Sequence, residues 1–177
     1  MEEVIEIVNK NGKVVGKTTR QKAYKKGLLH LAVNMFVLNS KGQVYIQKRS
    51  ASKSSFPLHW DISASEHVKP GETPKNAALR GLKEELSINT KIKLIRKKHI
   101  QKSIFKKNGK NIIENELVRL YLAKFNGKIK IDKNEVASGK FVSLKLLKTL
   151  IKKEPFTPWG LEEIQFLQKK KLSPETN

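Results

Sequence analysis

The sequence predicts an α+β protein that folds as one domain. Three observations support this prediction. Several segments alternate apolar and polar residues in pairs around turn sequences, one central segment has the apolar spacing of a helix, and two further helical segments follow near the C-terminus. The length of 177 residues suits one domain with its own core. We therefore expect a single domain over residues 1–172, with a flexible tail over 173–177.

Paired strand segments account for most of the expected sheet. Each pair flanks a short turn that contains Gly together with Asn, a combination typical of β-hairpins. A polar loop is expected over residues 50–57. The expected strands are residues 4–8 with 13–17, 28–38 with 43–48, 91–101 with 112–125, and the short segments 60–63 and 140–143.

The clearest helix is expected from Thr73 to Leu86. Thr73 is a good N-cap, and Pro74 is tolerated at the first helical position. Ala78, Leu79, Leu82 and Leu86 then form one apolar stripe. Further helices are expected over residues 21–26, 144–152 and 158–170.

Composition excludes several classes of protein. Cysteine is absent, which excludes a disulfide framework, a thiolate metal site and a cysteine nucleophile. No apolar run reaches the length of a membrane span, and the Met-Glu-Glu start does not resemble a secretory signal, so we expect a cytoplasmic protein.

The net charge of +21 arises from 37 Lys and Arg against 16 Asp and Glu. Such a field attracts nucleotides, diphosphates or RNA. Because lysines occur along the whole chain, a general compositional bias explains the charge equally well. Nucleic acid therefore stays an open alternative as a partner.

Acidic side chains gather at the central helix, although acids are scarce in this chain. On a helical wheel, Glu84 and Glu85 lie away from the apolar stripe, and Glu72 lies just before the helix. Mg²⁺ prefers such oxygen ligands and usually takes further oxygens from a phosphate. Two adjacent glutamates alone would fit a solvated helix face, but these three acids together favour a site for Mg²⁺ or Mn²⁺.

The same region contains a longer pattern. Residues 66–88 resemble the Nudix box, G-x5-E-x7-R-E-U-x-E-E-x-G-U, in which U is a bulky aliphatic residue. Three positions depart from the box, since Glu66 and Ser87 replace glycines and Gly81 replaces a glutamate. The positions that match in register are Glu72, Arg80, Leu82, Glu84, Glu85 and Ile88.

Flanking motifs extend the resemblance over most of the chain. They are similar to the isopentenyl-diphosphate-isomerase branch of the Nudix superfamily. The resemblance implies a mixed β-sheet sandwiched between α-helices (α/β/α), with the box helix presenting its acids to the site. The flanking motifs lie at residues 27–32, 39–42, 47–53, 56–60, 114–116 and 156–159.

The resemblance also implies a metal site. Glu85 matches a metal-liganding acid of the box, with Glu84 as its partner and Glu72 as a further ligand or a supporting acid. His30 and His67 match two metal-binding histidines of the isomerase, and Glu114 and Glu116 match its acids. The isomerase's first histidine has no counterpart, because Ala23 and Tyr24 lie in its neighbourhood. Arg80 resembles an arginine that holds a glutamate by a salt bridge.

Substrate-binding residues are implied in the same way. Arg49 and Lys53 match basic positions that bind diphosphate, although both would also suit the surface loop of a basic protein. Trp159 has two interpretations, since it either stacks on the substrate or packs the last helix onto the sheet.

The expected activity is Mg²⁺-dependent hydrolysis of the diphosphate linkage in a nucleoside diphosphate derivative or another organic diphosphate. Ser65 stands where the isomerase has a cysteine that exchanges protons with carbon, and a hydroxyl is a far weaker acid than a thiol. Because Gly81 removes a glutamate that often acts as base, the expected catalytic residues are Glu116, Glu85 and Glu114. The alternatives are a catalytically weakened Nudix module that binds a nucleotide or RNA, and an isomerase.

Overall fold

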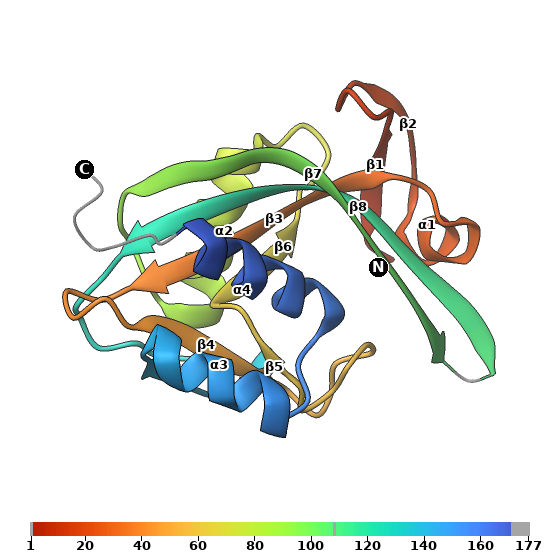
Figure 1. Ribbon diagram of the computed structural model, residues 1–177. Helices are drawn as coiled ribbons and strands as arrows, with labels where there is room; N and C mark the ends of the chain where they lie inside the picture. The colour runs from red at the N-terminus through yellow and green to blue at the C-terminus, as the bar shows by residue number, and fades with distance from the viewer. Residues whose placement is uncertain (1, 108, 171–177) are drawn as a thin grey trace.

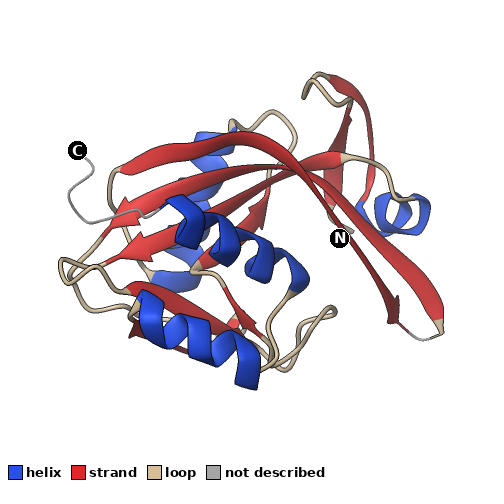
Figure 2. Ribbon diagram, viewed as in Figure 1, coloured by secondary structure: helices blue, strands red, loops and turns tan. Residues whose placement is uncertain are grey.

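A mixed β-sheet with helices on both faces forms the protein, as a computed structural model shows (Figures 1 and 2). The structure describes residues 2–107 and 109–170. The expected tail over 173–177 lies outside the described residues. The strands are β1 (Val4–Val8), β2 (Val14–Thr19), β3 (His30–Leu38), β4 (Val44–Arg49), β5 (Trp60–Asp61), β6 (Ala64–His67), β7 (Ile92–Lys107), β8 (Lys110–Lys124) and β9 (Val136–Val142). The helices are α1 (Arg20–Lys26), α2 (Pro74–Leu86), α3 (Leu144–Lys153) and α4 (Pro158–Lys170).

Strand β3 organises the sheet. It runs parallel to β8 from the pair His30–Glu116 to the pair Leu38–Lys124, and antiparallel to β6. The remaining strands extend the sheet through β1–β2 beside β3, and through β9 and β5 beside β4. The predicted mixed sheet is therefore confirmed.

The predicted hairpin between residues 28–38 and 43–48 is wrong beyond its turn. Strands β3 and β4 pair only at Leu38 and Val44. The two strands then separate, because β3 bonds to β8 and β6 while β4 bonds to β9. The predicted strand over 60–63 is likewise replaced by β5 and the unexpected β6, which carries Ser65, Glu66 and His67.

The hairpin of β7 and β8 is longer than predicted. Lys106 and Lys107, expected in the turn, continue β7 and pair with Asn111 and Lys110. The hairpin extends beyond the body of the molecule beside α1 (Figure 1).

The central helix begins and ends as predicted. The Thr73 hydroxyl accepts a hydrogen bond from the Asn76 backbone N–H at 3.2 Å, and Ser87 ends α2 in the left-handed conformation. Ala78, Leu82 and Leu86 of the apolar stripe are fully buried against the sheet.

Alternation along β3 builds two cores. Val33, Met35 and Val37 pack toward α2, whereas Phe36 and Leu38 pack with residues of α3 and α4 on the opposite face. In Figure 1 the blue helices α3 and α4 lie in front of the sheet and the yellow-green α2 lies behind it. The expected α/β/α sandwich is confirmed. Strand β3 lies between β6 and β8, so side chains at its start, near His30, lie close to both neighbouring strands. No helix among the described residues is long and apolar enough to cross a membrane.

Candidate active site

A cavity of about 630 Å³ opens where the ends of β6 and β8 meet α2. Most of the side chains predicted for the site line this cavity. Glu114, Glu116 and His67 come from β8 and β6, Glu84 and Glu85 from α2, Arg49 from the end of β4, Trp159 from the start of α4, and Lys53 from the loop after β4. Among the predicted residues, His30 and Glu72 lie just outside this lining.

Sheet register brings His30, His67 and Glu116 together. His30 stands opposite Glu116 across the parallel β3–β8 pair, and His67 stands opposite Ala32, two residues further along β3. Nε2 of His30 lies 3.6 Å, and Nε2 of His67 3.3 Å, from Oε1 of Glu116. One ligand atom from each residue lies within 4.8 Å of the others, which is close enough for all three to bind one cation.

The environment of His30 suits a metal ligand. Its side chain is fully buried, and Nδ1 lies 2.9 Å from the Leu28 carbonyl oxygen, to which it donates a hydrogen bond as Nδ1–H. Nε2 then carries a lone pair, and it has no hydrogen-bond partner among the described residues. A buried acceptor without a partner is costly, and a cation at Nε2 would relieve that cost.

The protonation of His67 depends strongly on the acidic side chains that contact it. Burial opposes its charged form, but hydrogen bonds with Glu116 and Glu3 outweigh burial and raise the pKa of His67 to about 10. The contacts with His30 and His67 likewise overcome burial and lower the pKa of Glu116. A cation bound here would therefore displace a proton from His67.

Two residues that sequence reasoning missed complete this group. The Tyr24 hydroxyl lies 3.0 Å from Nε2 of His67, so Tyr24 contacts this group directly. Oε1 of Glu3 lies 3.0 Å from Nδ1 of His67, and this hydrogen bond holds the pKa of Glu3 at about 2. The Tyr24 position was visible in the sequence, whereas Glu3 gave no signal.

Glu114 lies beside this group without joining it. Burial and the charge of Glu116 raise the pKa of Glu114 to about 7. A carboxylate with such a pKa exchanges protons readily near neutral pH. Glu114 is thus suited to proton transfer, and Glu116, with its two histidine contacts, is suited to holding a cation.

The acids of the box occupy three different environments. Glu72 accepts two hydrogen bonds from Arg80 at 3.0 Å each, and Glu84 is half exposed and 3.3 Å from the same guanidinium. Arg80 also donates to Glu66 and to the His67 carbonyl, so it joins α2 to the loop and to β6 as a structural residue. Glu72 and Glu84 do not belong to the three-residue group of His30, His67 and Glu116.

Glu85 is buried beneath the cavity. It accepts hydrogen bonds from Nε2 of Gln47 at 2.8 Å and from the Ser65 backbone N–H at 3.3 Å. Burial, opposed by the Gln47 hydrogen bond and aided by the charge of Glu66, raises the pKa of Glu85 to about 8. A bound cation would favour its ionised form.

The basic side chains on the opposite wall are held by protein partners. Arg49 donates to the Ser55 carbonyl and contacts Asp61 at 3.4 Å, while Lys53 forms an ion pair with Glu135. Trp159 is buried, and its Nε1–H donates to Asp61 at 2.9 Å.

Asp61, another residue that sequence reasoning missed, joins these groups. It is fully buried, and it fixes Trp159 and Arg49 in one layer, with the guanidinium 5.3 Å from the indole ring. A lone acid inside the apolar segment 60–62 was the signal that could have identified it.

Comparisons with known proteins identify the family of this chain and its fold. The family model described as NUDIX domain matches residues 28–160. The chain is 31% identical over 161 residues to isopentenyl-diphosphate Delta-isomerase 2 of Photorhabdus laumondii, covering 90% of this chain and 89% of that protein. It is 42% identical to an uncharacterized Nudix hydrolase of Nostoc sp., over 49% of this chain and 52% of that protein. The crystal structure of DR0079 from Deinococcus radiodurans superposes with a TM-score of 0.72 at 22% identity, covering 94% of this chain and 98% of that one.

Proposed function

Because the chain belongs to the NUDIX family, we propose that it is a hydrolase that cleaves the diphosphate linkage of a nucleoside diphosphate derivative or another organic diphosphate with the aid of Mg²⁺ or Mn²⁺. One observation supports this proposal most directly. The cavity has the size of a small-ligand site, and carboxylates of α2 and β8 line it together with the basic side chains of Arg49 and Lys53. A cation and a diphosphate together would neutralise both walls.

His30, His67 and Glu116 are proposed to hold a cation, with Glu85 and Glu84 binding from the helix side. The buried, unpartnered Nε2 of His30 supports this assignment. A divalent cation, when bound, would offset the charge of the diphosphate oxygens. Glu72 is proposed as a supporting acid, because Arg80 holds both of its oxygens.

The reaction requires a water oxygen to attack one phosphorus while the bond from that phosphorus to the bridging oxygen breaks. The leaving phosphate takes the bonding electron pair, and a carboxylate takes the proton of the water. We propose Glu116 or Glu114 as that base. The raised pKa of Glu114 matches the task better, whereas the histidine contacts of Glu116 favour cation binding. Arg49 and Lys53 would leave their protein partners to hold the diphosphate.

The test is cleavage of the diphosphate linkage in a panel of nucleoside diphosphate derivatives, capped RNA and prenyl diphosphates with Mg²⁺ or Mn²⁺, followed by chromatography of the phosphorylated products. Glu116→Gln and Glu114→Gln should each lower turnover by about 10²- to 10⁴-fold if the residue acts as base or ligand. Glu162→Gln, which removes an acid of α4 that does not line the cavity, is the matched control and should retain full turnover. Wild-type protein that cleaves the diphosphate linkage of none of these substrates would refute the proposal.

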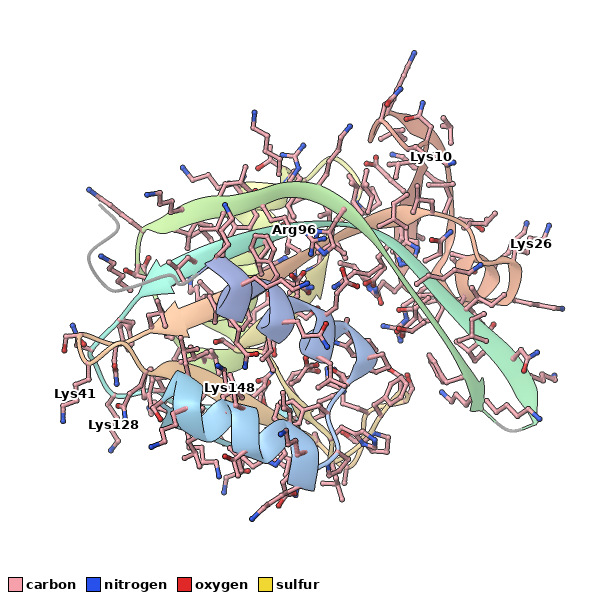
Figure 3. The ribbon with its side chains drawn as sticks, in the orientation of Figure 1. Lys10, Lys26, Lys41, Arg96, Lys128 and Lys148 are labelled. Carbon is pink, nitrogen blue, oxygen red and sulfur yellow. The ribbon has the colours of Figure 1, made fainter. Side chains whose placement is uncertain are left out.

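A second candidate function is a binding module for RNA or a nucleotide with weakened catalysis. The absence of a carboxylate at Gly81 and the charge of +21 favour it. The distribution of the charge opposes it, because RNA-binding proteins usually concentrate basic residues on one face. In Figure 3 the labelled lysines lie in several parts of the molecule, with Lys10 and Lys26 on one side, Lys41 and Lys128 together on the other, and Lys148 on α3. RNA binding that weakens steeply with salt, without turnover, would support the module.

The isomerase alternative follows from the relative in Photorhabdus laumondii, which carries that name. Ser65 lines the cavity at the position implied for the isomerase cysteine. Isomerisation of a prenyl diphosphate without release of phosphate would favour this alternative over hydrolysis.

A further inference from the structure

The side chain of Glu66 fills the space above Gly81. A Cβ added at residue 81 would lie 2.5 Å from Cγ of Glu66 and 2.9 Å from Cε of Met35. The methyl group of Met35 can move aside, but Cγ of Glu66 lies close to its own backbone and would have to shift with the whole side chain. The glycine inside α2, which is costly in a helix, thus has a local reason.

Two of the three departures from the box therefore compensate each other. Glu66 replaces a glycine on β6, and Gly81 replaces a glutamate on α2. The side chain lost from the helix is replaced by one that enters the same space from the strand. A carboxylate consequently remains beside the cavity, although its backbone attachment has moved.

Glu66 is oriented toward the cavity rather than merely packed. Its Oε2 accepts a hydrogen bond from Nη1 of Arg80 at 2.7 Å, and its side chain is partly exposed where it lines the cavity beside Glu85. No hydrogen bond reaches Oε1 of Glu66 from the residues that the structure describes. Arg80 therefore holds the carboxylate of Glu66 in place through Oε2, and Oε1 stays available to bind a cation.

We propose that Glu66 replaces the carboxylate missing from α2, as a catalytic residue that binds the divalent cation together with Glu85. This rests on the proposed hydrolase function for its chemistry, though not for its geometry. Two carboxylates from different elements that approach one space repel each other, and a hard cation between them removes that repulsion. His30, His67 and Glu116 would bind that cation from the strands, as proposed above.

The competing explanation is that Glu66 only anchors Arg80. Glu66→Gln separates the two roles, because the amide oxygen can still accept from Arg80 while the negative charge is lost. We expect Glu66→Gln to weaken Mn²⁺ binding by about tenfold or more, measured by titration calorimetry on the whole protein, with an unchanged unfolding temperature. Mn²⁺ affinity equal to that of wild type would overturn the proposal. Glu162→Gln again serves as the control and should bind Mn²⁺ as wild type does.

An exchange of the two residues gives a stricter test. Glu66→Gly should lose Mn²⁺ affinity by about tenfold or more, and Gly81→Ala should do the same because its Cβ displaces the Glu66 side chain. The double variant Glu66→Gly with Gly81→Glu returns a carboxylate to the same space from the helix and should recover most of the lost affinity. A double variant that folds, as judged by its unfolding temperature, yet binds Mn²⁺ no better than Glu66→Gly would overturn the proposal.

The measurements separate this inference from the hydrolase itself. If the wild type binds Mn²⁺ in a manner that depends on Glu66 but cleaves no diphosphate linkage in the panel, the hydrolase proposal fails and the assignment of Glu66 as a cation ligand stands. If the wild type hydrolyses a diphosphate and Glu66→Gln keeps both turnover and Mn²⁺ affinity, the hydrolase stands and this inference fails. A wild-type chain that binds no Mn²⁺ refutes the inference directly.

Discussion

Replacement of Glu85 by Gln should make the cation-free protein more stable at alkaline pH. In the folded chain burial raises the pKa of Glu85 from its ordinary value of 4.5 to about 8. The folded state therefore binds a proton between these two values and the unfolded state does not. The stability that this proton provides is fully present below pH 4.5 and is lost as pH rises to about 8.

The raised pKa of Glu85 sets an upper limit on this loss of stability. The interval from 4.5 to about 8, at about 1.4 kcal/mol for each tenfold change in proton affinity, corresponds to about 5 kcal/mol. The side chain introduced by Glu85→Gln would be accommodated, because Oε1 of Gln47 has no hydrogen-bond partner among the described residues and can accept from the new amide once Gln47 turns over. The Ser65 N–H can still donate to the oxygen of that amide.

Urea unfolding of both proteins at pH 5, 6.5 and 8, with EDTA present, measures the effect. The free energy of unfolding of Glu85→Gln relative to wild type should rise by several kcal/mol between pH 5 and pH 8. Other titrating groups are common to both proteins and cancel in this difference. Addition of Mg²⁺ at pH 8 should stabilise the wild type and leave Glu85→Gln unchanged. A difference that stays constant across this pH range would show that Glu85 is ionised in the folded, cation-free protein and would refute the reasoning.

Three further outcomes are expected. Asp61→Ala leaves the Arg49 charge and the Trp159 N–H without their buried partner. It should lower the free energy of unfolding by about 3–5 kcal/mol and the unfolding temperature by about 6–20 °C in a thermal melt, and Asp61→Asn should lower both by less. His30→Ala should weaken Mn²⁺ binding by about 10- to 100-fold in calorimetry at unchanged salt, and a variant that binds Mn²⁺ normally would exclude His30 as a ligand. Lys53→Met should raise the KM for a diphosphate substrate by about tenfold with little change in kcat, because Lys53 is assigned to substrate binding. An unchanged KM would show that Lys53 serves only as the ion-pair partner of Glu135.

Short sequence patterns predicted the helices and strands that depend on residues only a few positions apart. Thr73, Pro74 and the apolar spacing predicted α2, because capping and periodicity depend on residues a few positions apart. The pairing of β3 was not predictable in this way. Its partners β6 and β8 are distant in sequence, and because β3 is buried on both faces, alternation does not indicate its neighbours.

The residues of the candidate site were likewise predictable only in part. The residues assigned from the box and its flanks nearly all line one cavity, as the register of the family pattern implies. Glu3 was missed because its approach to His67 depends on how β1 joins the sheet. Gly81 and Glu66 were both recognised as departures from the box, but only the packing of β6 on α2 shows that one side chain fills the space left by the other.

The environment of Ser65 bears on the choice between hydrolysis and isomerisation. Its hydroxyl donates to the side-chain oxygen of Asn34 at 2.8 Å, and Asn34 in turn donates to Glu163 of α4 and Gln101 of β7. The proton of Ser65 is thus directed away from the cavity, toward a buried polar network. A hydroxyl is already a poor acid, and this orientation also removes its proton from any carbon of a bound substrate. What Ser65 presents to the cavity is its oxygen lone pairs, which suit contact with a cation or a water molecule and therefore agree with hydrolysis rather than with protonation of carbon.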